Sequence, residues 1–520
     1  MTTTQGCDII RNTPNKYTSK GDASVRKSLI VIICVLIVGI VIFMSGAEKT
    51  GFFPVKDKFV NSREGYTLNI PEGFWVDKSF LPHTVRLVSE NCVIEVYSQP
   101  CNGKDETDSY INYTNSAVTL NSIDYSNVRE IKNIGSSVLF WDRKKLSGIK
   151  NDRNHYLKID IPHKDRVYTI LVKSKEELSD YRKYKALLDI GKSSGNESLS
   201  SVVKYASGRR FNDETREFYN NVFVNSDKVE WGIYQPDFRD MPHIYYIEEH
   251  IGHKFNIVLH YTDLLVTYNP TLVRDVLDKA YFEGRTVELT LQPYRDHVGE
   301  NTLFSVLDGK YDEFLHAYAK DVAEFSHPVL FRLCNEMNGD WCEYSGYKMS
   351  LDTELYRELY HYVYNIFKEH NADNVIWVWN PNGKSFPDFE WNHESMYYPG
   401  NDYVDVLGLT LYNTGNFYEG EKWIEFDDLY RPLYERVSKE YDMPFMITEF
   451  ASARKGGNKE KWTRKMLSEI GDYPNIKVAV WWNGADFDAD GNISRAYYIN
   501  DSTEMTDIFK EYFNSYHIDN

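Results

Sequence analysis

The C-terminal part of the chain alternates between short apolar runs and helical runs, and this alternation constrains the fold most. From about residue 209 to residue 520, eight runs are rich in aliphatic, β-branched and aromatic residues, which is typical of strands buried on both faces. The runs are 229–235, 255–261, 286–292, 328–335, 374–380, 403–412, 444–450 and 476–482. The segments between them have helical spacing. Eight such strand–helix units predict an α/β fold, the (β/α)8 or TIM barrel.

Residues 51–190 show a different pattern, of short strands with little helix between them. The runs 65–70, 85–89, 92–98 and 137–142 have strand composition, and 155–161 and 166–173 flank a four-residue turn that predicts a hairpin. Ser174-Lys-Glu-Glu177 is a capping box and predicts a helix that runs to Gly191. We therefore expect a small antiparallel α+β domain in front of the barrel.

This small domain carries no evident chemistry. Its opening, GYTLNIPEGFWVD, resembles the entry strand of PsbP/Mog1-like domains. It has no carboxylate pair and no nucleophile that stands out, so we expect a spacer or ligand-binding role. The Gly/Ser-rich segment 191–208 is typical of a linker and separates it from the barrel domain, 209–520.

An uncharged apolar run, 28–47, precedes both domains and is long enough to span a bilayer as a helix. Five Lys or Arg residues precede it, against two Asp residues, which favours a cytoplasmic location for residues 1–27. The sequence thus predicts a single-pass signal-anchor in the cell membrane, with everything after Lys49 extracellular. The alternative is a cleaved signal peptide, because Ser45-Gly-Ala47 offers small residues for a peptidase.

Charge and cysteine content exclude some classes of protein. Asp and Glu outnumber Lys and Arg by 77 to 59, a net charge of −18, which argues against a nucleic-acid partner. The six cysteines show no metal-binding spacing, and we expect neither a metal nor a cofactor. A strand separates Cys92 from Cys101 too widely for a disulfide, whereas Cys334 and Cys342 flank a Gly-containing turn and could pair.

Two predicted barrel strands end on glutamate, and this is the strongest functional signal. The fourth strand closes as RLCNEMNGDW, with Glu336, and the seventh as MITEF, with Glu449. Chemistry in such barrels lies at the C-terminal edge of the strands, and an unpaired buried carboxylate is costly. Each glutamate could simply pair with a neighbour such as Arg332. The pair together instead indicates glycoside hydrolysis, in which two carboxyls about 5–5.5 Å apart retain the anomeric configuration.

At these strand ends the chain resembles glycoside hydrolase family 26 of clan A, the family of β-mannanases with some β-1,3-xylanases and mixed-linkage glucanases. The resemblance covers about 209–520. It is carried by Arg332-x-x-x-Glu336-Met-Asn-Gly-x-Trp341, and by WGIYQP, DGKYDEF, NVIWVWNPN, YPGNDYVDVLGLTLY, ITEF and VWWN. It implies that Glu336 is the acid/base and Glu449 the nucleophile. It also implies that Tyr412 hydrogen-bonds the nucleophile and that Trp481 forms the floor of the sugar site.

One residue departs from the family pattern, which usually has His before the acid/base where this chain has Asn335. Other clan A families carry Asn there, where its amide contacts the sugar 2-hydroxyl, so the change bears on the sugar rather than on catalysis. The expected substrate-binding residues are Asn335, Arg332, Trp341, Tyr412, Trp481 and Trp482.

The sequence leaves more than one function open. The first is a membrane-anchored extracellular retaining endo-β-glycosidase, β-1,4-mannanase-like, that acts on a β-linked polysaccharide or oligosaccharide. A β-1,3/1,4-glucanase or a β-xylanase of the same fold is the alternative within that chemistry. A catalytically silent protein for carbohydrate binding or exopolysaccharide assembly is the alternative outside it. The intact glutamate pair favours the enzyme.

Overall fold

The computed structural model describes residues 52–53, 58–133, 135–191, 209–236, 241–265, 268–269, 273–293 and 299–518. The predicted cytoplasmic tail and membrane segment (1–47) and most of the predicted linker lie outside the described residues. Within the described ranges, no helix combines the length and the apolarity that a membrane crossing requires.

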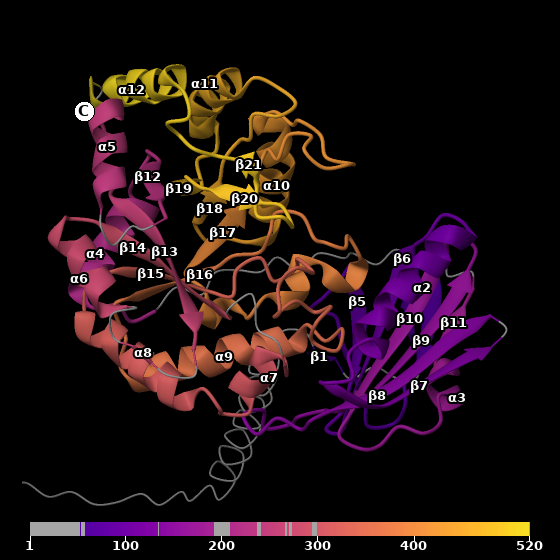
Figure 1. The fold of residues 1–520 in the computed structure, drawn as a ribbon. Coiled ribbons are helices and arrows are strands. Elements are labelled where there is room, and N and C mark those ends of the chain that lie inside the picture. Colours follow the sequence, from indigo (N-terminus) through magenta and orange to yellow (C-terminus); the bar gives the residue numbers. More distant parts are fainter. Residues whose placement is uncertain are drawn as a thin grey trace, which may run out of the picture. The chain divides into compact units, whose positions relative to one another are not determined.

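Eight parallel strands close into a barrel, as the sequence predicts (Figure 1). The strands are β12 (Glu230–Tyr234), β13 (Ile257–Leu264), β14 (Thr286–Pro293), β15 (Val329–Leu333), β16 (Val375–Trp379), β17 (Val406–Thr410), β18 (Phe445–Phe450) and β19 (Ile476–Trp482). All eight coincide with the predicted runs. Continuous β-branched and aromatic composition is what a strand needs when helices cover one face and the barrel interior the other.

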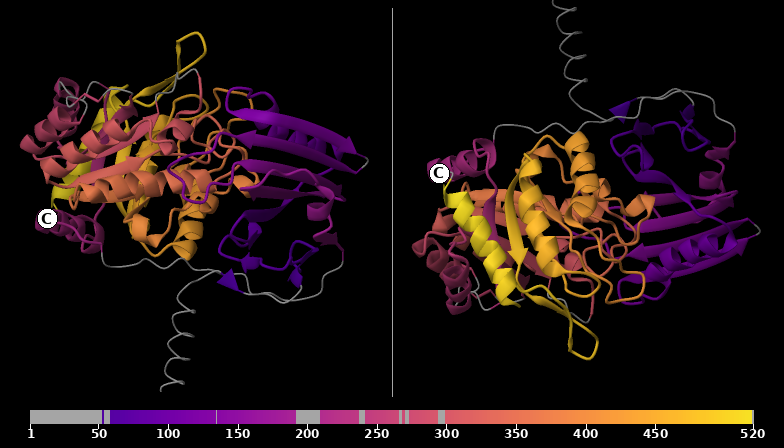
Figure 2. Two further views of the ribbon diagram at one scale, coloured as in Figure 1. Left: turned by 90° about the horizontal axis from the view of Figure 1, so that it is seen from below. Right: turned by 90° about the horizontal axis from the view of Figure 1, so that it is seen from above.

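Helices cover the outside of the barrel. They are α5 (Pro242–Ile251), α6 (Arg274–Phe282), α7 (Thr302–Leu307), α8 (Asp312–Phe325), α9 (Glu354–Glu369), α10 (Phe426–Glu440), α11 (Lys459–Glu469) and α12 (Thr503–Ile518). Three short 3-10 helices replace an α-helix between β16 and β17: η4 (Glu390–Asn392), η5 (Glu394–Tyr397) and η6 (Asn401–Tyr403). After β19, the hairpin of β20 (Ala485–Phe487) and β21 (Ile493–Ala496) projects from the barrel (Figure 2).

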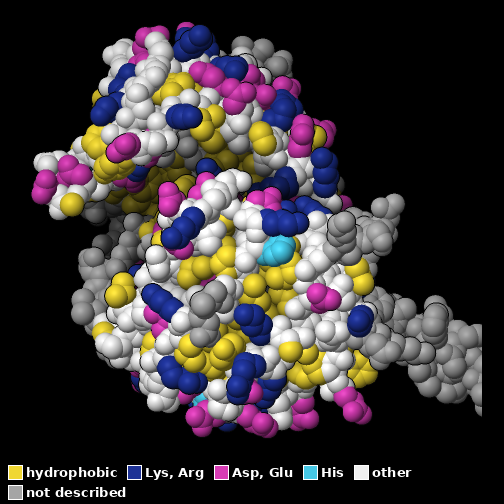
Figure 3. Space-filling view, turned by 90° about the vertical axis from the view of Figure 1, so that its right-hand side faces the viewer, with side chains coloured by type: hydrophobic (Ala, Val, Ile, Leu, Met, Phe, Trp, Pro, Cys, Tyr) yellow, Lys and Arg dark blue, Asp and Glu magenta, His cyan; other side chains and the backbone are white. Residues whose placement is uncertain are grey.

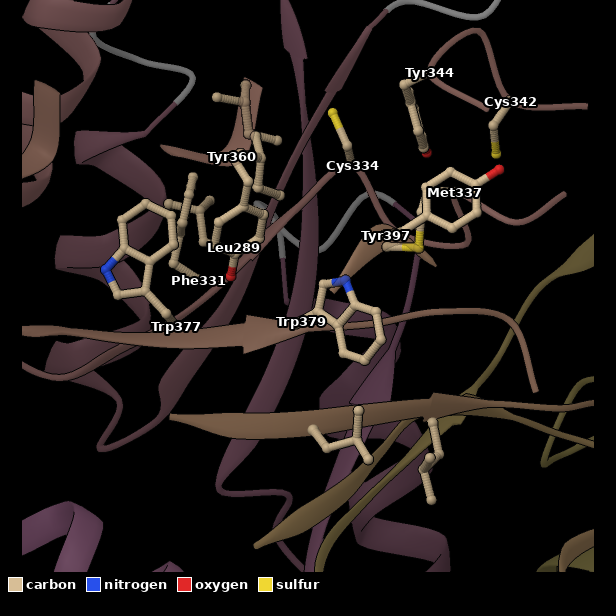
Figure 4. Packing of buried hydrophobic residues seen from close by; sticks show 14 of the residues in the cluster. Leu289, Phe331, Cys334, Met337, Cys342, Tyr344, Tyr360, Trp377, Trp379 and Tyr397 are labelled. Atoms are coloured by element: carbon tan, nitrogen blue, oxygen red, sulfur yellow. The ribbon is translucent and has the colours of Figure 1, made fainter. Parts of the chain in front are cut away.

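The barrel has two separate apolar layers. The larger lies between strands and helices; Figure 4 shows part of it, with Phe331 and Trp377 packed against Tyr360 of α9. The smaller fills the barrel interior and includes Phe211, Tyr219 and Phe223. Tyr219 is the last residue of α4 (Asp213–Tyr219), and Phe223 lies in the π-helix η1 (Asn220–Val224). Both helices pack against this interior layer.

The small domain is built around an eight-stranded sheet of order β1-β4-β5-β6-β10-β9-β8-β7. Its strands are β1 (Phe52–Phe53), β4 (Trp75–Asp77), β5 (Thr84–Val88), β6 (Cys92–Pro100), β7 (Tyr125–Asn133), β8 (Ser136–Arg143), β9 (His155–His163) and β10 (Arg166–Ser174). β2 (Lys58–Asn61), β3 (Tyr66–Asn69) and β11 (Leu188–Ile190) form a second sheet, and α2 (Lys104–Thr119) is the main helix.

The predicted strands and hairpin of this domain are present, but the predicted helix from Ser174 to Gly191 is wrong. Ser174 ends β10, and its hydroxyl accepts from the Glu176 N–H at 3.0 Å in a local turn. Only α3 (Arg182–Lys185) is helical before β11 begins. The capping-box residues thus close a strand because pairing of β10 with β6 continues through Ser174.

The small domain contacts the loop that follows β15. Lys173, on β10, is buried and places its ammonium 2.8 Å from Asp352 and 2.9 Å from Glu354 at the start of α9. Tyr113, on α2, donates a hydrogen bond to Asp340 in the same loop. Each of these buried charges has a partner, as burial demands.

The face in Figure 3 shows basic side chains interspersed with acidic ones.

Candidate active site

Glu449 and Glu336 both lie at the C-terminal edge of the barrel, but in different settings. Glu449 is the fifth residue of the six in β18, whereas Glu336 follows the end of β15 by three residues. Their spacing therefore depends on the path of the loop after β15. The predicted carboxyl separation of about 5–5.5 Å, which is the separation typical of retaining enzymes, stays a prediction.

Four donors surround the buried carboxylate of Glu449. The Arg332 guanidinium lies 2.6 Å from one oxygen, which also accepts from the hydroxyl of Tyr261 at 2.6 Å. The Tyr412 hydroxyl donates to the other oxygen at 2.7 Å, and the Asn335 amide reaches the first at 3.4 Å. Hydrogen bonds and an ion pair therefore hold both carboxyl oxygens of Glu449 in place.

The two tyrosines remain donors. Burial, reinforced by the charge of Glu449, raises the pKa of both Tyr261 and Tyr412 well above the ordinary value. Arg332 is also fully buried, which opposes its charge, but the carboxylates of Glu449 and Glu288 raise its pKa on balance. Glu449 therefore lies between one permanent cation and two neutral hydroxyls.

Glu336 is fixed mainly through the backbone. Its φ of +58° lies in the left-handed region, which costs a non-glycine residue some free energy. Its N–H donates to the carbonyl of Asn380 at 2.7 Å, and the amide of Asn382 donates to its carboxyl at 2.6 Å. Asn338 and Asn382 exchange two further hydrogen bonds, at 2.8 and 2.9 Å. These bonds tie the loop after β15 to the loop after β16.

Two exposed aromatic rings lie beside the acid/base loop. Trp341 is 48% exposed and Phe386 is 44% exposed, and their ring centroids are 5.4 Å apart. A pocket next to them is lined by Glu336, Asn335, Trp341 and Tyr344, among others. Flat apolar faces of this kind are suited to stacking on sugar rings.

Trp481, expected as the floor of the sugar site, lies elsewhere. It is fully buried and packs edge-on against Phe450 and Phe509, on the helix-facing side of β19. The next residue, Trp482, points to the other side because side chains alternate along a strand. Its indole N–H donates to the Tyr261 hydroxyl at 3.2 Å, so Trp482 is the tryptophan of β19 that contacts the nucleophile's surroundings.

The structure adds three residues to those expected from sequence: Tyr261, Asn382 and Glu288. Tyr261 and Asn382 end or follow predicted strands, and their position at the C-terminal edge is the signal that could have identified them. Glu288 lies within β14, away from the strand end.

The four cysteines in the described residues are free thiols. Cys334 and Cys342 are free thiols, both buried near Met337 and Tyr344 (Figure 4), so the possible disulfide is not formed. Cys92 and Cys101 are free as well. Across the described part of the chain, no cluster of three or more His, Cys, Asp or Glu side chains is arranged to bind a metal ion.

Part of the sequence matches the model of a known family. Residues 278–476 match the family model of Glycosyl hydrolase family 26. Endoglucanase H of Acetivibrio thermocellus is 30% identical over 238 residues, which is 45% of this chain and 25% of that protein. A mannan endo-1,4-beta-mannosidase of Bacillus subtilis is 40% identical over 92 residues, 16% of this chain and 24% of that protein.

The chain thus spans about a quarter of the length of these curated relatives. Among solved structures, the catalytic domain of a Bacillus sp. JAMB-750 endo-beta-1,4-mannanase is 18% identical with a TM-score of 0.45, over 60% of this chain and 92% of that one. The resemblance of the barrel to glycoside hydrolase family 26 is therefore confirmed, over residues 278–476.

Proposed function

We propose that the barrel is a retaining endo-β-glycosidase domain that hydrolyses a β-linked polysaccharide or oligosaccharide. The observation that carries this proposal is the setting of Glu449, a buried carboxylate with four donors at a strand end. A second carboxyl, that of Glu336, lies on the loop after β15 at the same edge of the barrel. A protein that only binds sugars gains nothing from such a costly anion.

In the first chemical step Glu449 attacks the anomeric carbon and forms a covalent glycosyl-enzyme. Glu336 donates its proton to the departing glycosidic oxygen, and the bond between that oxygen and the anomeric carbon breaks. The Tyr261 and Tyr412 hydroxyls and Arg332 keep the attacking carboxylate correctly oriented until then.

In the second step Glu336, now ionised, removes a proton from water. The water attacks the anomeric carbon, the ester to Glu449 breaks, and the sugar leaves with its original configuration. The hydrogen bond from Asn382 fixes the orientation of the Glu336 carboxyl.

The substrate we propose is a β-1,4-mannan, with a β-1,3/1,4-glucan or a xylan as the alternative. Several relatives are named as mannan endo-1,4-beta-mannosidases, whereas the relative with the longest matched stretch among those described above is named as an endoglucanase. The Asn335 amide nitrogen lies 3.4 Å from a Glu449 oxygen, and we infer from this position that it contacts the 2-hydroxyl of the sugar. Mannose and glucose differ in that 2-hydroxyl, so this residue bears directly on the choice.

Product analysis on mannan, galactomannan, mixed-linkage glucan and xylan tests this proposal. We expect oligosaccharides from one of these polymers, and the newly formed reducing ends, followed by NMR as they appear, should be β. The same preparation of Glu449→Gln is the matched control. Initial α products, or equal rates for wild type and control, would contradict the retaining mechanism.

We also propose that the domain acts outside the cell, attached to the membrane through residues 28–47. The support is the apolar run and the excess of Lys and Arg before it. Protease added to intact cells should remove residues 51–520 and leave the tail. A protected barrel with a cleaved tail would reverse the orientation, and release of the barrel into the medium would indicate cleavage.

A further inference from the structure

The lower layers of the barrel interior are mostly aliphatic. The interior positions of the other strands are mostly aliphatic: Ile257, Leu259, Leu330, Ile376, Val378, Val406, Met446, Val478 and Val480. β14 instead places Glu288 there, fully buried and next to Leu259 of β13 and Leu330 of β15 in the sheet. Aliphatic side chains normally fill these layers, so a carboxyl at this depth needs a reason.

Glu288 has little to stabilise a charge. Neither of its carboxyl oxygens has a hydrogen-bond partner among the described residues. Its one ion contact is with Nε of Arg332, at 3.3 Å. Burial, partly offset by Arg332 and reinforced by Glu449, raises the pKa of Glu288 from 4.5 to about 8.

Arg332 is shared between two carboxyls. Its Nε faces Glu288 and donates to the Thr290 hydroxyl at 2.8 Å, while its Nη1 lies 2.6 Å from Glu449 and 3.0 Å from the Asn380 oxygen. One buried cation can fully compensate only one buried anion, so the charges of the two glutamates are coupled.

We propose that Glu288 is a positioning residue for the nucleophile, acting through Arg332. While Glu288 is a neutral acid, Arg332 forms an ion pair with Glu449 alone. When Glu288 ionises, it competes with Glu449 for the same guanidinium, and the nucleophile loses part of its fixed geometry. This inference rests on the proposed function, because it assigns Glu449 as the nucleophile.

The charged and titratable groups that face Glu288 are few. From β15 it faces Arg332, from β18 the charge of Glu449, and β13 contributes Tyr261, whose ring lies under the same guanidinium at 5.4 Å. Tyr261 stays neutral because burial raises its pKa well above the ordinary value. The alkaline pH response expected of this layer therefore belongs to Glu288.

The first test is the pH dependence of kcat/KM on an activated aryl glycoside. Such a substrate needs no proton from Glu336, so loss of activity at alkaline pH reports on the nucleophile side alone. Between pH 7 and pH 9 the kcat/KM of the wild type should fall roughly five- to ten-fold, because at pH 9 only about a tenth of Glu288 remains protonated. In Glu288→Gln the side chain cannot ionise, so the kcat/KM of this variant should stay constant over this range.

The matched control is Glu230→Gln, which changes another glutamate on a barrel strand. Glu230 begins β12, at the opposite end of the strands from Glu449, and accepts from Asn256 at 2.9 Å. This variant should keep the wild-type pH profile. A wild-type profile that is level to pH 9, or the same alkaline loss in wild type and Glu288→Gln, would overturn the proposal. The wild-type measurement decides even if the variant does not fold.

The second test needs no activity and separates this inference from the proposed function. A carboxyl whose pKa is raised on folding stabilises the protein below pH 4.5, and that contribution falls as pH rises towards 8. Tm should therefore fall less between pH 6.5 and pH 9 in Glu288→Gln than in wild type. Glu449→Gln lacks the negative charge that helps to raise the pKa of Glu288. In this variant Tm should therefore fall over a lower pH range than in wild type.

These outcomes can be told apart. Absence of hydrolysis on every glycan with the expected Tm pattern would refute the proposed function and leave the coupling of Glu288 to Glu449 intact. Equal Tm shifts in all three proteins would refute the coupling even if the enzyme is active.

Discussion

Glu449 lies inside a β-strand, whereas Glu336 lies in a loop with a left-handed backbone. Glu449 is placed by side chains: one guanidinium, two hydroxyls and an amide from four different positions. Glu336 is placed by its own backbone and by the bonds between the loops after β15 and β16. A nucleophile must keep one charge state and one position, while an acid/base must change its charge in every cycle. The two settings correspond to these two tasks.

The largest effect should follow from removing the nucleophile. Glu449→Ala leaves no group to form the covalent intermediate, so turnover should fall by roughly four orders of magnitude on polymer and on aryl glycosides alike. Added azide could occupy the vacated space and should give a product of inverted configuration. NMR of that product is the measurement, and a retained product would show that the roles of the two glutamates are wrongly assigned.

Glu336→Ala should behave differently on the two substrate classes. Hydrolysis of polymer needs a proton on the leaving oxygen and should nearly stop, whereas an activated aryl glycoside should still form the glycosyl-enzyme. Azide should then give a product of retained configuration. Steady-state rates on both substrates check this, with circular dichroism to verify folding. Equal losses on both would argue against Glu336 as the acid/base.

Removing one hydroxyl from Glu449 should cost less. A hydrogen bond to a charged group is worth about 1.5–3 kcal/mol, so Tyr412→Phe and Tyr261→Phe should each lower kcat roughly 10- to 150-fold. The loss should be the same on polymer and aryl glycoside, because it concerns the nucleophile alone. A loss confined to polymer would mean that these tyrosines serve Glu336 instead.

The smallest effect should come from the contact of the small domain with the acid/base loop. Tyr113→Phe removes the hydrogen bond to Asp340 and should lower kcat/KM on polymer by a few-fold, in line with about 0.5–1.5 kcal/mol. Aryl glycosides should be unaffected. Tyr245→Phe, which changes an exposed tyrosine on α5, is the control. An equal effect on both substrates would mean that the small domain acts only on stability.

The sequence was sufficient to predict those parts of the fold that have a continuous apolar pattern. All eight barrel strands were predictable because a strand buried on both faces has an unbroken apolar composition. Glu336 and Glu449 were predictable because charge at the end of such a strand is conspicuous. The same continuity hides which residues face inward: Trp481 and Trp482 are equally apolar, and only the pleat of β19 decides which one contacts Tyr261.

The elements that sequence missed depend on long-range pairing. The helix predicted after Ser174 is absent because β10 continues its ladder with β6 through that residue. The helix α2 was missed because its sequence is largely polar, and its buried residues, such as Tyr110, become recognisable only against the sheet. In the sequence Glu288 is a single polar residue within a strand, and its contact with Arg332 becomes evident only in the folded barrel.

The left-handed backbone at Glu336 also has a consequence for relatives of this protein. At φ +58° glycine or asparagine would relieve strain that glutamate must bear. With Glu336 as the proposed acid/base, stability and the proposed activity favour different residues at this position. A descendant that no longer hydrolyses its ligand would be expected to drift towards Gly or Asn there. The residue aligned with Glu336 is thus a simple indicator, in any related sequence, of whether selection still maintains the chemistry.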